Sequence, residues 1–137
     1  MKESFAPYGE IIEVNPFSSD TFQVVLSEEQ VNGWRIAVSN LSGKRIVKKL
    51  GLHPNTRESF EPLNGVVVIV VATKEEPDNI KAFLLDQPVC LYKNVWHANI
   101  ALSAQAAVKI TENATEIESL HHTLKEAITV GLVSSDF

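Results

Sequence analysis

Six consecutive β-branched residues, Val66 to Val71, constrain the fold of this chain more than any other feature. Branching at Cβ favours the extended backbone, and an apolar residue at every position is typical of a strand buried on both faces. With Ala72 the apolar run is still far shorter than the roughly 20 residues that a membrane-spanning helix needs. The run therefore predicts a central strand that other structure covers on either side.

Further short strands are predicted wherever apolar and β-branched residues cluster between turn-forming residues. Asn15-Pro16, Ser42-Gly43 and His53-Pro54 are three such turns. A short helix is predicted over residues 79–85, and the last fifth of the chain is predicted to run from a helical turn into a final strand. The other predicted strands cover residues 22–26, 34–38, 45–50, 89–92, 98–102 and 107–110.

The 137 residues are expected to form a single domain, 1–137, because no linker or internal repeat divides them. Many short strands with few helices favour a mainly β fold, either a sandwich, a jelly roll or a small barrel. The net charge is −5 and no basic stripe occurs, so neither nucleic acid nor a membrane is an expected partner. A single cysteine and the absence of a recognisable export signal make the cytoplasm the expected location.

Two polar segments, residues 53–65 and 92–97, place titratable and aromatic side chains beside apolar strands. His53, Glu58 and His97 are the candidate metal ligands, because two imidazoles and a carboxylate suit a divalent ion and leave positions open for a substrate. Spacing alone also allows the ordinary interpretation, in which these side chains belong to a turn and a solvated surface.

Four neighbouring residues are candidates for substrate binding. Arg57 and Lys93 carry the positive charge that would hold a small carboxylate, and Tyr92 and Trp96 could form the walls of a pocket. Each has an ordinary alternative, which is surface charge for the two cations and core packing for the two aromatic residues. The expected substrate is a small molecule that carries a carboxylate.

The two polar segments resemble the two motifs of the cupin superfamily. His53, Glu58 and Gly65 have the spacing of the first motif, and Trp96-His97 is similar to the end of the second, whose histidine is the last metal ligand. The first histidine of the usual His-x-His pair is absent, because Gly51 occupies its position. The resemblance implies a cupin-like double-stranded β-helix, a jelly-roll barrel with few short helices. It also implies one divalent metal ion held by His53, Glu58 and His97.

A finer resemblance is to the ureidoglycolate lyases. It is carried by residues 5–13, by His53-Pro54 with the following Ser59-Phe60 and Pro62-Leu63, by the apolar run, and by the pattern from Phe83-Leu84 to Trp96-His97. It implies an enzyme, a carbon–nitrogen lyase that cleaves ureidoglycolate to glyoxylate and urea in allantoin and purine catabolism. It further implies that His53, Glu58 and His97 are catalytic and that Arg57, Tyr92, Lys93 and Trp96 contact the substrate.

The chain also departs from that family's usual pattern. Leu52 replaces a basic residue, Glu58 replaces a glutamine, and Glu112-Asn113 replaces an Asp-Arg pair. These departures leave open an alternative, a non-catalytic or divergent cupin that binds a small carboxylate metabolite. Another cupin reaction, such as an isomerase or oxygenase step, is a third possibility. A homodimer is expected, because small barrels with exposed edge strands often pair them.

Overall fold

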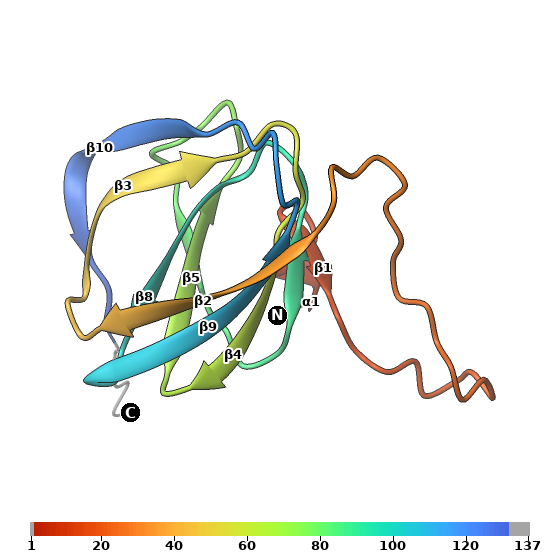
Figure 1. The fold of residues 1–137 in the computed structure, drawn as a ribbon. Coiled ribbons are helices and arrows are strands. Elements are labelled where there is room, and N and C mark those ends of the chain that lie inside the picture. The colour runs from red at the N-terminus through yellow and green to blue at the C-terminus, as the bar shows by residue number, and fades with distance from the viewer. Residues whose placement is uncertain (1, 132–137) are drawn as a thin grey trace.

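The computed structural model describes residues 2–131 as two antiparallel sheets packed face to face (Figure 1). Sheet A has the strand order β1-β7-β4-β9-β2, and sheet B has the order β10-β3-β8-β5-β6. The predicted mainly β, cupin-like class is confirmed. The elements are α1 (Lys2–Phe5), β1 (Gly9–Ile11), β2 (Arg35–Ser42), β3 (Ile46–Leu52), β4 (Ser59–Asn64), β5 (Val67–Ala72), β6 (Lys81–Leu84), β7 (Val89–Leu91), β8 (Trp96–Ala101), β9 (Gln105–Glu112) and β10 (Leu120–Thr129).

Strand β5 lies inside sheet B, between β8 and β6, and all six of its residues are buried. Val67, Ile69 and Val71 point into the core between the two sheets, where Phe60 and Val108 of sheet A meet them. The alternate residues pack on the other face, in a second cluster with side chains from β3, β8 and β10. Each buried Val or Ile contributes about 1.5–3 kcal/mol to folding. The prediction of a strand covered on both faces is therefore confirmed.

Strands were predicted correctly where tertiary packing agrees with the local pattern, which holds for β2, β3, β5, β7, β8 and β9. The prediction of a strand over residues 22–26 is wrong, because that segment forms no strand. The helix predicted over residues 79–85 is also wrong: β6 occupies most of it and pairs with β5, from Val68 opposite Leu84 to Val71 opposite Lys81. The helical turn predicted near the C-terminal end is replaced by strand β10, which pairs with β3; position 132 of the predicted final strand lies outside the described residues.

The chain passes from sheet A to sheet B between β4 and β5 through Asn64-Gly65. Gly65 has φ +72°, and a Cβ at this position would lie 2.3 Å from the carbonyl oxygen of Gln105. Glycine is therefore required here on two counts, the left-handed backbone and the close approach of β9.

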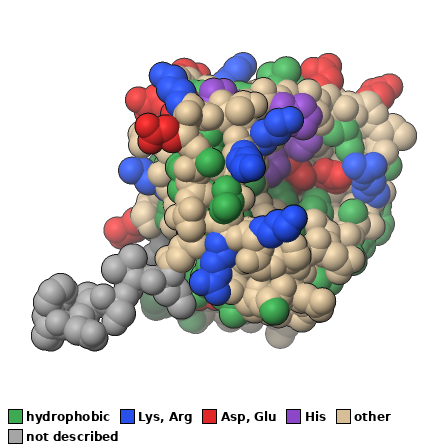
Figure 2. Space-filling model, turned by 90° about the vertical axis from the view of Figure 1, so that its left-hand side faces the viewer, with side chains coloured by type: hydrophobic (Ala, Val, Ile, Leu, Met, Phe, Trp, Pro, Cys, Tyr) green, Lys and Arg blue, Asp and Glu red, His purple; other side chains and the backbone are tan. Residues whose placement is uncertain are grey.

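Residues 12–34, between β1 and β2, leave the body of the molecule as a long extended segment, seen at the right of Figure 1. We call residues 12–34 the arm. Figure 2 shows the face that lies at the left of Figure 1, where hydrophobic side chains are scattered among charged side chains and histidines. No helix among residues 2–131 is long and apolar enough to cross a membrane.

Candidate active site

Three strand ends meet at one end of the barrel and bring the candidate ligands together. His53 directly follows β3, Glu58 directly precedes β4, and His97 is the second residue of β8. Because β3 belongs to sheet B and β4 to sheet A, the loop over residues 53–58 crosses from one sheet to the other. Leu52 and Trp96 belong to the cluster on the far face of sheet B, so the alternation of side chains turns His53 and His97 towards sheet A.

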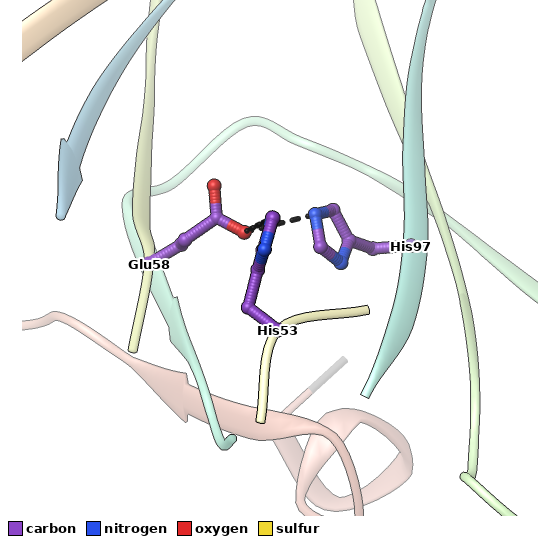
Figure 3. Close-up of side chains that lie close together, drawn as sticks. All are labelled: His53, Glu58 and His97. Carbon is purple, nitrogen blue, oxygen red and sulfur yellow. Dashed lines mark ion pairs between the residues drawn. The ribbon is translucent and has the colours of Figure 1, made fainter. Parts of the chain in front are cut away.

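Both imidazoles reach the same carboxylate oxygen (Figure 3). Nε2 of His53 lies 3.0 Å from Oε1 of Glu58, and Nε2 of His97 lies 2.9 Å from it. Glu58 is only 6% exposed, and the two rings stand 5.4 Å apart between their centroids. The structure thus brings together His53, Glu58 and His97, the three residues that the sequence singled out.

These contacts set the charges of the group. Burial by itself favours a neutral Glu58, but hydrogen bonds from His53 and His97 outweigh it and hold the pKa of this carboxyl far below its ordinary range. The hydrogen bond to Glu58 likewise raises the pKa of His53, against the opposing effect of burial. In the absence of a metal ion, His53 and Glu58 therefore favour an imidazolium–carboxylate pair.

The donor set fits a divalent metal ion. Nδ1 of His53 lies 2.9 Å from the carbonyl oxygen of Glu118, and Nδ1 of His97 lies 3.1 Å from that of Val95. Such backbone partners take the Nδ1 proton and leave Nε2 free to coordinate. Two ligand atoms at right angles, each about 2.1 Å from an ion, are about 3 Å apart, which matches the two Nε2–Oε1 distances. All three ligand atoms lie within 4.8 Å of one another.

Hydrogen bonds from residues 113–118 hold the loop that carries His53 and Glu58 in place. Asn113 is buried: its backbone N–H donates to Oγ1 of Thr56 at 3.0 Å, and its side-chain amide donates to the carbonyl oxygen of Asn55 at 3.2 Å. Oδ1 of Asn55 in turn accepts the N–H of Glu118 at 2.9 Å. Asn113 therefore holds the loop to the end of β9, a role that spacing along the chain could not reveal.

Glu112, the last residue of β9, lies beside Glu58 and is a second acidic group at this end of the barrel. Its carboxylate accepts from Nε of Arg35 at 2.8 Å, and its side chain is 9% exposed. Burial and the neighbouring Glu58 raise the pKa of Glu112, against the opposing effect of Arg35. Glu112 and Asn113, which replace an Asp-Arg pair in this chain, thus both lie next to the site. The sequence did not identify either of them as a site residue.

Arg57 turns away from the histidines. Its Nε donates to the carbonyl oxygen of Leu91 at 3.1 Å, and its terminal nitrogen lies 3.3 Å from both Glu10 and the carbonyl oxygen of Cys90. The guanidinium also lies 5.3 Å from the ring centroid of Tyr92. Arg57 therefore joins β1 to β7, and the structure does not bring it to the three ligands.

The remaining predicted substrate contacts divide between two places. Tyr92 is 41% exposed and lines the small hollow that His53, Glu58 and His97 also line. Lys93 follows it, and its one ion-pair partner among residues 2–131 is Glu28 of the arm, at 3.9 Å. Trp96 lies on the opposite face of β8 from His97, where its Nε1 donates to the carbonyl oxygen of Lys74 at 3.1 Å, so the structure does not bring it to the hollow.

Two amide oxygens near the site are buried with no hydrogen-bond partner among the described residues, Oδ1 of Asn94 and Oδ1 of Asn99. Asn94 has φ +67°, and its N–H donates to the carbonyl oxygen of His53 at 3.0 Å, which ties the loop before β8 to the first histidine. Asn99 lies two residues after His97 on the same face of β8. Its free oxygen is therefore an acceptor that faces the barrel interior.

Solved structures support the architecture. The crystal structure of a dTDP sugar isomerase from Desulfovibrio desulfuricans G20 is similar to this chain with a TM-score of 0.54. The match covers 90% of this chain and 82% of that one at 13% sequence identity. A likeness at this identity concerns the fold alone.

Sequence relatives are more specific. The ureidoglycolate lyase of Rhizobium etli (strain CIAT 652) is 29% identical over 123 residues, covering 76% of this chain and 74% of that protein. That of Agrobacterium fabrum is 30% identical over 115 residues, covering 70% and 69%. That of Brucella abortus is 26% identical over 139 residues, covering 87% of this chain and 82% of that protein.

The family model for ureidoglycolate lyase matches residues 34–130, which include all three candidate ligands and well over half of the chain. The chain therefore belongs to the ureidoglycolate lyase family, and the expectation of a lyase-like enzyme is confirmed.

Proposed function

We propose that this chain cleaves ureidoglycolate to glyoxylate and urea, as a step of allantoin breakdown, with His53, Glu58 and His97 as its catalytic centre. The observation that carries the proposal is the convergence of both imidazoles on one carboxylate oxygen. Family membership supplies the reaction class.

The reaction needs two proton transfers and no oxidant. One group removes the proton of the substrate hydroxyl, the carbonyl of glyoxylate forms, and the electron pair of the C–N bond leaves with the urea nitrogen, which takes up a proton. A carboxylate with a strongly lowered pKa is a weak base, so Glu58 serves to hold and orient the two imidazoles. In the metal-free site, His97 accepts the hydroxyl proton at Nε2 as the Nδ1–H tautomer that the carbonyl oxygen of Val95 favours. His53, whose pKa is raised, donates a proton to the leaving nitrogen.

Two residues next to those that line the hollow are candidates for substrate binding. Lys93 is the better candidate of the two predicted cations for the substrate carboxylate, because Arg57 already makes three hydrogen bonds within the chain. The unpartnered oxygen of Asn99 is a suitable acceptor for a ureido N–H. A divalent ion held by His53, Glu58 and His97 would replace the acid and base roles of the two imidazoles, because a coordinated Nε2 exchanges no proton. It would polarise the substrate hydroxyl and help to hold the carboxylate, and ordered water would carry the protons.

The direct test is to incubate the full chain with ureidoglycolate, after removal of divalent ions and again after their return, and to follow glyoxylate. We expect formation well above the spontaneous rate in at least one of these states. A rate equal to the spontaneous one in both states would refute the proposal.

The alternative of a metabolite-binding protein without chemistry is not favoured by the family match. A thermal-shift series with small carboxylates separates the two functions. Stabilisation by carboxylates without any glyoxylate formation would support the binding protein, whereas turnover excludes it.

A further inference from the structure

A row of charged side chains crosses sheet A at the level of the candidate active site. Arg35 of β2 pairs with Glu112 of β9. The register of β4 and β9 places Glu58, the residue before β4, opposite Glu112. Residues that lie opposite each other on antiparallel strands point to the same face of the sheet. Because Glu58 faces the two imidazoles, Glu112 and Arg35 face the interior of the barrel as well.

The packing along β2 and β9 agrees with this orientation. Leu41 of β2 and Val108 and Ile110 of β9 contact the core between the sheets. Each of them lies an even number of positions from Arg35 or Glu112 on its own strand, so all of these side chains share one face. In Figure 2, histidine and acidic side chains are seen together in a hollow of the surface, with Lys and Arg side chains around it.

Arg35 balances the charge of this row. Two carboxylates directly opposite each other repel, and Glu112 faces Glu58 with a side chain that is only 9% exposed. Nε of Arg35 donates to Oε2 of Glu112 at 2.8 Å, and Nη2 donates to the same oxygen. The row therefore holds a positive charge one side chain away from the carboxylate that both histidines contact.

The guanidinium of Arg35 has donors to spare. Arginine carries several N–H groups in one rigid plane, and Arg35 directs those on Nε and on one side of Nη2 to Glu112. Its other N–H groups have no acceptor among residues 2–131, and its side chain is 51% exposed. The free Nη1–Nη2 edge has the geometry that a carboxylate accepts through both of its oxygens.

We propose that Arg35 binds the carboxylate of the substrate through this free edge, and that Glu112 positions the guanidinium for it. The inference rests on the proposed function, since it names the group that receives one end of ureidoglycolate. In such a 2-hydroxy acid the carboxylate is bonded directly to the carbinol carbon, so holding it at Arg35 directs the hydroxyl towards the imidazoles. Arg35 is better placed for this contact than Lys93, which faces Glu28 of the arm.

The test compares the binding of glycolate with that of glycolamide, which has nearly the same shape and no charge. Calorimetric titration of the full chain as purified measures both affinities. We expect the unaltered protein to prefer glycolate by about 10- to 100-fold, and Arg35→Gln to lose this preference. Arg35→Lys should retain part of it, because lysine keeps the charge but not the paired N–H groups.

Two further variants make the result specific. Arg35→Gln leaves Glu112 without its cation, whereas Arg35→Gln combined with Glu112→Gln replaces the ion pair by two amides that can hydrogen bond. The double variant should also bind both ligands equally, which a loss of stability alone would not produce. Lys109→Gln is the matched control, because Lys109 lies on the outer face of β9 in an ion pair with Glu61, and it should keep the full preference.

Steady-state kinetics give a second readout, in which Arg35→Gln should raise KM for ureidoglycolate by about 10- to 100-fold and change kcat less. An unaltered protein without a preference for glycolate would overturn the inference. So would a preference that survives in both glutamine variants, or an unchanged KM in a variant that still forms glyoxylate. If the preference depends on Arg35 but the unaltered chain forms no glyoxylate, Arg35 remains the carboxylate-binding residue and the proposed reaction alone is refuted.

Discussion

Gly51 of β3 lies directly opposite His97 of β8, and a Cβ built on Gly51 would meet no atom within 4 Å. The position next to the ligand group is thus open and accessible from the same face of sheet B. In the pattern that the two polar segments resemble, this position carries a histidine.

Gly51→His should therefore add a further imidazole to the centre. We expect divalent-ion affinity to rise by at least about tenfold, the scale on which single metal-site interactions act. Calorimetric titration of metal-free protein with Zn²⁺ and Mn²⁺ measures it, and Gly51→Ala is the control for the backbone change. Equal affinities for all three proteins would show that the side chain at this position does not reach the ion.

Glu58→Gln keeps the shape of the side chain and removes the charge that both histidines contact. We expect loss of most of the bound metal and a fall in kcat of about 100-fold or more, because the amide neither pairs with an imidazolium nor binds a cation as strongly. Elemental analysis and glyoxylate assays measure the two effects. Glu61→Gln is the control, since Glu61 is an exposed partner of Lys109 at 3.1 Å and should behave like the unaltered protein.

The stability of metal-free protein should depend on pH through His53 and Glu58. The raised pKa of His53 means that its contribution is complete below the ordinary value of 6.5 and is lost as the pH rises through the raised pKa. The lowered pKa of Glu58 means that its contribution is complete above 4.5 and is lost as the pH falls from there through the lowered pKa. Maximum stability is therefore expected between pH 4.5 and 6.5.

Scanning calorimetry in a chelator from pH 4 to 9 checks this dependence. In His53→Asn the decline on the alkaline side should disappear, whereas His121→Asn, at an exposed position of β10, should retain it. An identical decline in all three proteins would assign it to other groups.

Asn113→Ala should loosen the loop that carries two of the ligands. Loss of its side-chain hydrogen bond at a buried position should cost about 1–3 kcal/mol of unfolding free energy, and kcat should fall because His53 and Glu58 are less well oriented. Urea unfolding and steady-state kinetics measure these effects. Asn79→Ala removes an exposed amide and should change neither, so equal losses in both variants would contradict a specific clamp.

Asn99→Leu should separate binding from stability. Removing a buried, unpartnered oxygen should leave the free energy of unfolding unchanged or raise it by about 1 kcal/mol. If that oxygen accepts a ureido N–H, KM for ureidoglycolate should rise by about tenfold. An unchanged KM in a stable variant would remove Asn99 from the substrate contacts.

Several parts of the fold and site could be predicted from local sequence because local pattern and final packing agree there. Val66 to Val71 can only be a strand covered on both faces, and His53, Glu58 and His97 occur beside strand ends in motifs of known spacing. The helix expected over residues 79–85 failed because the free edge of β5 offered hydrogen bonds that outweigh a weak helical pattern.

Other features depend on contacts between distant segments. Asn113 is a site residue only because the antiparallel register of β9 brings it against Thr56, which no spacing along the chain encodes. Residues 22–26 have the composition of a strand, but a strand needs a neighbour, and the part of the chain that the structure describes provides none.

The loop over residues 53–58, which crosses between the sheets, also affects the unfolding of the molecule. His53 and His97 are positioned by strands of sheet B, and Glu58 is positioned by a strand of sheet A. Any ion or substrate held by all three therefore links the two sheets. Such a link can form only after distant parts of the chain have come together, which happens late in folding. Occupancy of the site should accordingly lengthen the lifetime of the folded molecule while leaving its rate of formation nearly unchanged.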